Sequence, residues 1–139
     1  MINTLLVVDD HEGFRSFVSM LLDGDRFSIT GVAEDGESAL DAVDRLRPDL
    51  VLLDIQLPGI GGFEVAERLA SGAYRPDVVL TSTREANDFG ARLSQAPVLG
   101  FVPKNELSVE AISRLVESAN SRPSPKQEQA HDRPARGSA

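Results

Sequence analysis

Five short apolar segments recur along the chain and are separated by stretches of mixed polarity. The segments cover residues 4–8, 27–33, 50–54, 78–81 and 98–102. Residues 4–8 and 50–53 are almost wholly aliphatic, which is typical of strands buried on both faces of a parallel sheet. Residues 27–33 alternate between apolar and polar positions, as a half-buried strand does. The pattern therefore predicts five strands.

The stretches between these segments repeat apolar residues at helical spacing. The first has apolar positions at i, i+3, i+4, i+7 and i+8, namely Phe14, Phe17, Val18, Leu21 and Leu22. Similar stripes predict helices over residues 39–46, 63–69 and 108–119, the last capped by Ser108, and a weaker pattern covers residues 84–96. Strands that alternate with helices predict right-handed βαβ crossovers and an α/β fold, with helices on both faces of a parallel sheet.

Length and composition indicate one domain without disulfides. The chain has 139 residues and no cysteine, which also excludes thiolate metal sites and a cysteine nucleophile. Residues 121–139 hold three prolines and no aliphatic residue larger than alanine, and we expect a disordered polar tail there. No apolar run approaches the roughly 20 residues that cross a bilayer, and the N-terminus lacks the basic region of a signal peptide. We expect a cytoplasmic protein with no membrane partner.

The charge is strongly uneven along the chain. The net charge is −8, of which residues 1–120 carry −10 and residues 121–139 carry +2. An acidic domain repels the phosphates of nucleic acids. We therefore expect no direct binding of nucleic acid by residues 1–120.

Polar side chains that can do chemistry stand where the predicted strands end. Asp9 and Asp10 follow the first strand, Asp54 ends the third, Ser82 follows the fourth, and Lys104 follows the fifth. Ligands of open parallel α/β sheets bind beyond the carboxyl ends of the strands. Carboxylates crowded there repel one another, and Mg²⁺ would relieve that repulsion. A carboxylate-bound metal with a lysine and a hydroxyl nearby suits a phosphoryl transition state.

Each of these residues also has a simpler interpretation. Asp9 alone is better explained as a cap of the following helix, Lys104 as a solvated surface charge, and Ser82 as a turn hydroxyl bonded to its own backbone. Asp54 is harder to explain in this way, because an acid at the end of an apolar strand and opposite two other acids is costly to bury. The constellation is more specific than any of its members.

Taken together, these residues resemble the receiver domains of two-component response regulators. The resemblance rests on Asp9-Asp10, on Asp54-Ile-Gln-Leu-Pro-Gly, on Ser82 and on Gly100-Phe-Val-Pro-Lys104, and it covers residues 1 to about 120. The spacings agree as well, with 44 residues from Asp10 to Asp54, 28 more to Ser82 and 22 more to Lys104. The resemblance implies a flavodoxin-like (βα)5 fold with strand order 2-1-3-4-5.

The resemblance also implies roles for the matching positions. Asp54 would accept a phosphoryl group from a histidine kinase or a phosphotransfer protein, with self-phosphorylation and autodephosphorylation as its only enzymatic activity. Lys104 would contact the acceptor carboxylate or the phosphoryl oxygens, and Ser82 would bond a phosphoryl oxygen. Mg²⁺ would be bound by the residues Asp10, Asp54, Gln56 through its main-chain carbonyl, and Asp9 through a water.

The resemblance further implies a switch and an output surface. Ser82 and Phe101 would move on phosphorylation and remodel the surface of the fourth helix, fifth strand and fifth helix, where a downstream protein or a second receiver would bind. Phe101 is explained equally well as a core residue of its strand.

Two roles for the chain stay open. Because the chain ends soon after the fifth predicted helix, we expect a stand-alone receiver. The alternative is the receiver portion of a NarL-type DNA-binding transcriptional regulator, whose receivers the stretch from Gly100 to Leu107 resembles. An aspartate-nucleophile phosphatase would need Asp-x-Asp after the first strand, and a flavodoxin would need a phosphate loop there. Residues 9–12 read Asp-Asp-His-Glu, which fits neither.

Overall fold

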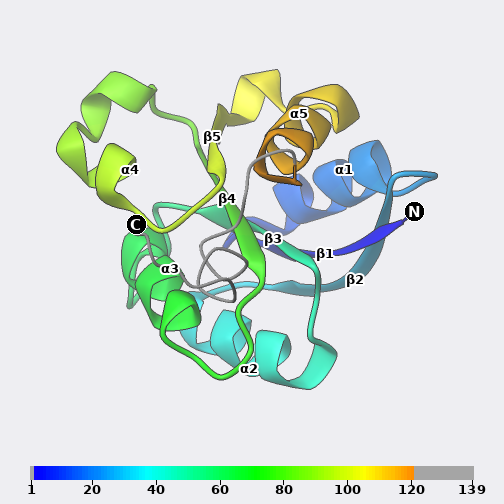
Figure 1. The fold of residues 1–139 in the computed structure, drawn as a ribbon, viewed down its shortest axis with the longest axis horizontal. Coiled ribbons are helices and arrows are strands. Elements are labelled where there is room, and N and C mark those ends of the chain that lie inside the picture. Colours follow the sequence, from blue (N-terminus) through cyan, green and yellow to red (C-terminus); the bar gives the residue numbers. More distant parts are fainter. Residues whose placement is uncertain (1, 121–139) are drawn as a thin grey trace, which may run out of the picture.

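A computed structural model describes residues 2–120, which form a parallel sheet flanked by helices (Figure 1). The strands are β1 (Asn3–Val8), β2 (Phe27–Ala33), β3 (Leu50–Asp54), β4 (Asp77–Ser82) and β5 (Gly100–Pro103). The helices are α1 (Glu12–Leu22), α2 (Gly36–Leu46), α3 (Gly62–Ala70), α4 (Ala91–Gln95) and α5 (Val109–Asn120). All neighbouring strands are parallel in the order β2-β1-β3-β4-β5, which confirms the predicted fold and strand order.

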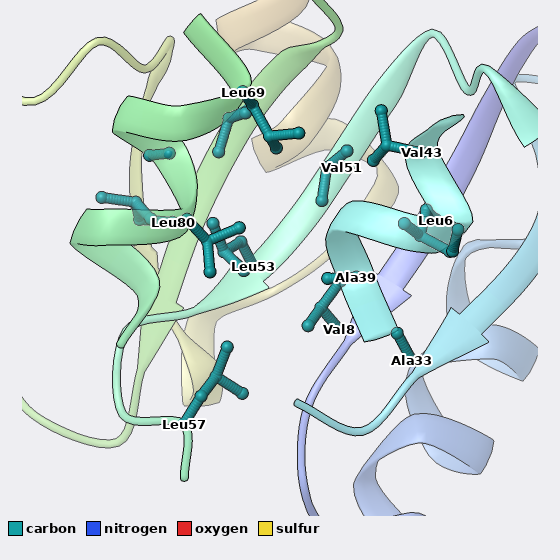
Figure 2. Close-up of a cluster of buried hydrophobic side chains, with 14 of the residues drawn as sticks. Leu6, Val8, Ala33, Ala39, Val43, Val51, Leu53, Leu57, Leu69 and Leu80 are labelled. Atoms are coloured by element: carbon teal, nitrogen blue, oxygen red, sulfur yellow. The ribbon is translucent and has the colours of Figure 1, made fainter. Parts of the chain in front are cut away.

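The core lies in two layers, one on each face of the sheet. Successive strand residues point to opposite faces. Leu52 of β3 packs with Val18 of α1 and Ile112 of α5, whereas the next residue, Leu53, packs with Val43 of α2 on the other face (Figure 2). Every residue of β3 is buried, and each buried leucine stabilises the fold by about 2 kcal/mol. This explains why the sequence of β3 is apolar without alternation up to its final aspartate.

Helix α1 covers the sheet with a narrower stripe than predicted. Val18 and Leu22 are buried, but Phe17 is 58% and Leu21 37% exposed. Phe17 and Leu21 each precede a buried residue by about 100° around the helix, so they lie at the edge of the stripe rather than on it. The prediction that all five positions face the core was therefore wrong for Phe17 and Leu21.

The predicted helix over residues 84–96 is mostly absent. The chain forms a 3-10 turn, η1 (Ala86–Asp88), and then the short helix α4. Gly90 separates them with φ of +57°, in the left-handed region where a helix cannot continue. The prediction of one helix was wrong outside residues 91–95.

Helix α5 follows a second 3-10 turn, η2 (Lys104–Glu106). The Ser108 hydroxyl oxygen accepts a hydrogen bond from the backbone N–H of Ala111 at 3.0 Å, which confirms the predicted cap. Among residues 2–120 no helix is long and apolar enough to span a membrane. The tail predicted over residues 121–139 lies outside the described residues.

Candidate functional site

The carboxyl ends of four adjacent strands assemble the predicted site. Asp54, the last residue of β3, lies beside Thr81 of β4, and Ser82 at the end of β4 lies beside Pro103 of β5. Asp9 follows β1, which pairs with β3 on its other side. Lys104 comes directly after Pro103. The parallel register thus places residues from four distant parts of the sequence at one edge of the sheet.

Lys104 lies between two buried carboxylates. Its Nζ is 2.6 Å from Oδ2 of Asp9 and 3.3 Å from Oδ2 of Asp54. The Asp9 side chain is fully buried, and that of Asp54 is 5% exposed. Two buried negative charges share one ammonium group, so this part of the site has an excess of negative charge.

The two carboxylates differ in their affinity for protons. Burial raises the pKa of Asp54 to about 6, and the nearby charge of Asp9 adds to this, against the opposing effects of the Gln56 N–H and Lys104. Burial also opposes ionisation of Asp9, but Lys104 and the backbone N–H of His11 outweigh it and lower the pKa of Asp9. The two carboxylates in turn raise the pKa of Lys104, although its burial acts in the opposite direction. Lys104 and Asp9 therefore form a stable ion pair, and Asp54 is the carboxylate whose negative charge is only partly balanced.

Local hydrogen bonds fix the loop that follows Asp54. Oδ1 of Asp54 accepts a hydrogen bond from the backbone N–H of Gln56 at 3.0 Å. Gly62 at the start of α3 lies so close to β3 that a Cβ there would be 2.4 Å from the carbonyl oxygen of Asp54. Only glycine fits this approach, and it lets α3 begin directly against the end of β3. The Gly62 N–H donates to the carbonyl of Ile55 at 2.8 Å.

Ser82 lies at the predicted position in the site, and its hydroxyl also bonds to the backbone of the following turn. Its hydroxyl oxygen accepts a hydrogen bond from the backbone N–H of Arg84 at 3.0 Å, and the hydroxyl donates to the side-chain oxygen of Gln56 at 3.4 Å. The second bond joins the loop after β4 to the loop after β3. Ser82 is fully buried, and its hydroxyl is held between these two loops rather than by solvent.

Asp10 and Phe101 lie outside this buried centre. The Asp10 side chain is 35% exposed, and its Oδ1 is 3.1 Å from Nδ1 of His11. Phe101 on β5 is half-buried and makes an edge-to-face contact with Phe89, with ring centroids 6.0 Å apart. Phe89 makes a similar contact with Phe63 of α3 at 5.8 Å. The interpretation of Phe101 as a packing residue therefore has direct support, and its role as a switch stays a prediction.

Two neighbours of the site were missed by the sequence patterns. The ring of Phe14 lies under Lys104, with Nζ 4.2 Å from the centroid. Phe14 fits the apolar stripe of α1, so nothing in the pattern separated it from a core residue. His11 is adjacent in sequence to the two acids, and that adjacency was the available signal.

The contact between Phe14 and Lys104 leads to a prediction. An aromatic ring face attracts the ammonium by about 0.5–1 kcal/mol. If Asp54 is the phosphoacceptor that the sequence resemblance implies, Phe14→Leu should slow phosphoryl uptake from acetyl phosphate about threefold. The rate can be followed by intact mass. The matched control is Phe17→Leu on the same helix, where the ring is 58% exposed, and it should react at the wild-type rate. Equal rates for all three proteins would exclude a contribution of the ring.

The raised pKa of Asp54 predicts a pH-dependent stability. The ordinary pKa of the carboxyl is 3.8 and its folded value is about 6, so its favourable contribution to folding is complete below the first value and is lost as pH rises through the second. Asn cannot ionise, so Asp54→Asn should raise the free energy of unfolding by about 2 kcal/mol at about pH 8 and by little at about pH 4. Urea denaturation in EDTA measures both values. A similar gain at the two pH values would mean that ionisation is not the cause.

Comparison with known proteins identifies the family of the chain. The model of the response regulator receiver domain family matches residues 5–117. The chain belongs to the response regulator receiver domain family. This receiver domain is 40% identical over 117 residues to the response regulator GacA of Pseudomonas protegens, covering 81% of the chain and 54% of GacA. It is 30% identical over 101 residues to the DNA-binding transcriptional activator EvgA of Escherichia coli, covering 73% of the chain and 50% of EvgA.

Solved structures agree with these relatives. The signal receiver domain of NarL from Mycobacterium tuberculosis matches 86% of this receiver domain and 98% of its own chain, with a TM-score of 0.76 and 29% identity. The response regulator domain of CheB from Thermotoga maritima has the same fold, with a TM-score of 0.76 at 21% identity. The chain spans about half the length of the curated relatives it matches. It is the receiver domain of a two-component response regulator.

Proposed function

We propose that Asp54 accepts a phosphoryl group from the phosphohistidine of a histidine kinase or a phosphotransfer protein. The observation that supports this most strongly is the position of Lys104, whose Nζ contacts both Asp9 and Asp54 at the end of β3. Asp54 is the carboxylate whose pKa is raised, so a bound cation would stabilise its ionised form most. Because the donor kinases use ATP, which is found inside the cell, we propose that the reaction takes place in the cytoplasm.

The residues of the site fit a hard divalent cation. Excess buried negative charge and oxygen donors at an open sheet edge suit Mg²⁺. We propose that the ligands are the carboxylates of Asp10 and Asp54 and the main-chain carbonyl of Gln56, with Asp9 acting through a water. When bound, the ion would neutralise charge on the transferring phosphoryl oxygens.

The proposed step balances without a further reactant. A carboxylate oxygen of Asp54 attacks phosphorus and forms an acyl phosphate, while the P–N bond to the donor histidine breaks and its electron pair stays on the imidazole. Lys104 is close enough to follow the acceptor oxygen and to bind a phosphoryl oxygen. Ser82 would donate its hydroxyl hydrogen to another phosphoryl oxygen. Both residues stabilise charge rather than form bonds, as phosphoryl transfer requires.

The switch is proposed to start at Ser82. Its hydroxyl now donates to Gln56, and a phosphoryl group on Asp54 would compete for that hydrogen. Movement of the loop after β4 would reach Phe89 and, through their edge contact, Phe101. The surface of α4, β5 and α5 would then change for a protein target or a second receiver. We propose residues 1–120 as this signalling unit, with residues 121–139 as its tail.

A second candidate concerns the output. GacA and EvgA match this chain over about half of their length, and EvgA is named a DNA-binding transcriptional activator. In this candidate, phosphorylation of Asp54 controls a DNA-binding domain in a longer gene product instead of a separate protein partner. Sequencing the transcript beyond the codon for Ala139 distinguishes the two.

The phosphoacceptor proposal is tested by incubating the protein with acetyl phosphate, with Mg²⁺ or with EDTA. We expect intact mass to show the gain of one phosphoryl group only with Mg²⁺, and borohydride reduction with peptide mapping to place it on Asp54. A gain that does not depend on Mg²⁺ would remove the metal from the proposal. No gain in either condition would overturn the proposal itself.

A further inference from the structure

The imidazole of His11 lies against the acidic pair that precedes it. Its Nδ1 is 3.1 Å from Oδ1 of Asp10 and 3.3 Å from Oδ1 of Asp9. Among the described residues, these three side chains form a group whose donor atoms all lie within 4.8 Å of one another. The imidazole is 73% exposed, so it can turn without disturbing the core.

The spacing of these atoms matches the spacing of neighbouring ligands around a metal ion. Adjacent donors of an octahedral ion with bonds of about 2.1 Å are about 3 Å apart. The oxygens of Asp9 are already engaged, Oδ1 by the backbone N–H of His11 at 2.8 Å and Oδ2 by Lys104 at 2.6 Å. Asp10 and His11, whose side chains are 35% and 73% exposed, are therefore the two members of the group that can turn toward an ion, and we call them the Asp10–His11 pair.

We propose that Nδ1 of His11 is a ligand of the divalent ion bound at Asp10, and that this nitrogen shifts the preference of the site from Mg²⁺ toward borderline transition metals such as Mn²⁺. The inference rests on the metal site of the proposed function. Mg²⁺ takes oxygen ligands almost exclusively, whereas imidazole nitrogen favours the first-row transition metals. The competing explanation is that the imidazole only donates a hydrogen bond to the two carboxylates.

Mn²⁺ separates the two explanations because its pulsed EPR spectrum detects a directly bound nitrogen. We expect the Mn²⁺-loaded wild-type protein to show coupling to ¹⁴N, and the coupling to change to the ¹⁵N pattern after labelling of histidine. His11→Gln should lose the coupling while keeping an oxygen donor of similar reach. The chain has two histidines, so His131→Ala is the matched control and should keep the coupling.

Affinity provides a second readout. Free Mn²⁺ measured by EPR, with Mg²⁺ as competitor, gives the ratio of the two affinities. His11→Gln should lower the preference for Mn²⁺ over Mg²⁺ about tenfold, the low end of the usual effect of losing a supporting ligand. Mn²⁺ that binds without nitrogen coupling, or an affinity ratio equal in wild type and His11→Gln, would overturn the proposal.

The outcome is distinguishable from failure of the phosphoacceptor function. If the wild-type protein gains a phosphoryl group with Mg²⁺ but shows no nitrogen coupling with Mn²⁺, the proposed function stands and only the role of His11 is contradicted. If the wild-type protein binds neither ion and gains no phosphoryl group, both the proposed function and the role of His11 are contradicted.

Discussion

Asp54→Asn should abolish the gain of a phosphoryl group from acetyl phosphate and Mg²⁺. The amide has no charged oxygen to attack phosphorus, but it has the same size and can still accept the hydrogen bond from the Gln56 N–H. Asp9, the other buried carboxylate, is the weaker nucleophile because Lys104 and the His11 N–H stabilise its charge and lower its pKa. Intact mass after incubation should show no shift.

The control for this variant is the same substitution at an exposed acid. Asp44→Asn on α2 removes one carboxylate far from the strand ends and should react as wild type does. A residual gain in Asp54→Asn would mean that another residue accepts the group, and peptide mapping would identify it. Loss of the gain in Asp44→Asn as well would point to a general effect of charge rather than to the acceptor.

The meeting of Asp9, Asp54 and Lys104 was predictable because it depends on topology more than on packing. Apolar strands alternating with helices require a parallel sheet, and a parallel sheet brings every strand's carboxyl end to one edge. The register then places Asp54 beside Thr81 and Ser82 beside Pro103. Side chains that end adjacent strands lie close together whatever their rotamers.

Contacts that depend on side-chain direction were not predictable in this way. Phe14 and Lys104 are far apart in sequence, and only the folded structure brings the ring under the ammonium. Asp10 was expected beside Asp54, but its carboxylate is directed to His11, because two residues beyond β1 the chain has left the sheet. Backbone patterns fix which edge a residue reaches and leave its orientation open.

The break in the helical pattern at Gly90 shows a second kind of feature that the sequence pattern does not predict. Residues 84–96 carry apolar positions at helical spacing, and Phe89 and Leu93 do pack against the core. Their spacing is satisfied by a 3-10 turn and a short helix as well as by one longer helix. The positive φ of Gly90 decides between them, and a glycine inside a periodic segment signals only that a break is permitted.

Lys104→Met should both destabilise the protein and slow its phosphorylation. Removing the ammonium leaves Asp9 and Asp54 buried without a counter-charge, which costs about 3 kcal/mol at about pH 8. It also removes a cation that stabilises the transferring phosphoryl group, so uptake from acetyl phosphate should fall about 100-fold. Urea denaturation and intact mass measure the two effects on the same samples.

The destabilisation should depend on pH with a definite sign. Lys104 lowers the pKa of Asp9 and opposes the rise of that of Asp54, so its removal raises both values in the folded protein. A carboxyl group whose pKa is raised by folding favours the folded state at low pH, and this contribution is lost as the pH rises through the folded pKa. The stability that Lys104→Met loses relative to wild type should therefore grow from about pH 5 to about pH 8. A loss that is constant over this range would indicate lost packing of the lysine stem instead of unpaired charge.

Two further variants isolate the charge effect. Adding Asp54→Asn to Lys104→Met removes one of the two unpaired carboxylates and should recover about half of the lost stability at about pH 8, a coupling typical of contacting residues. Arg45→Met removes an exposed cation that pairs with Asp41 on α2, and it should change the stability little. If the double variant is no more stable than Lys104→Met, Asp54 does not bear the unpaired charge. Asp54 would then not be the carboxylate of this site whose negative charge is incompletely balanced.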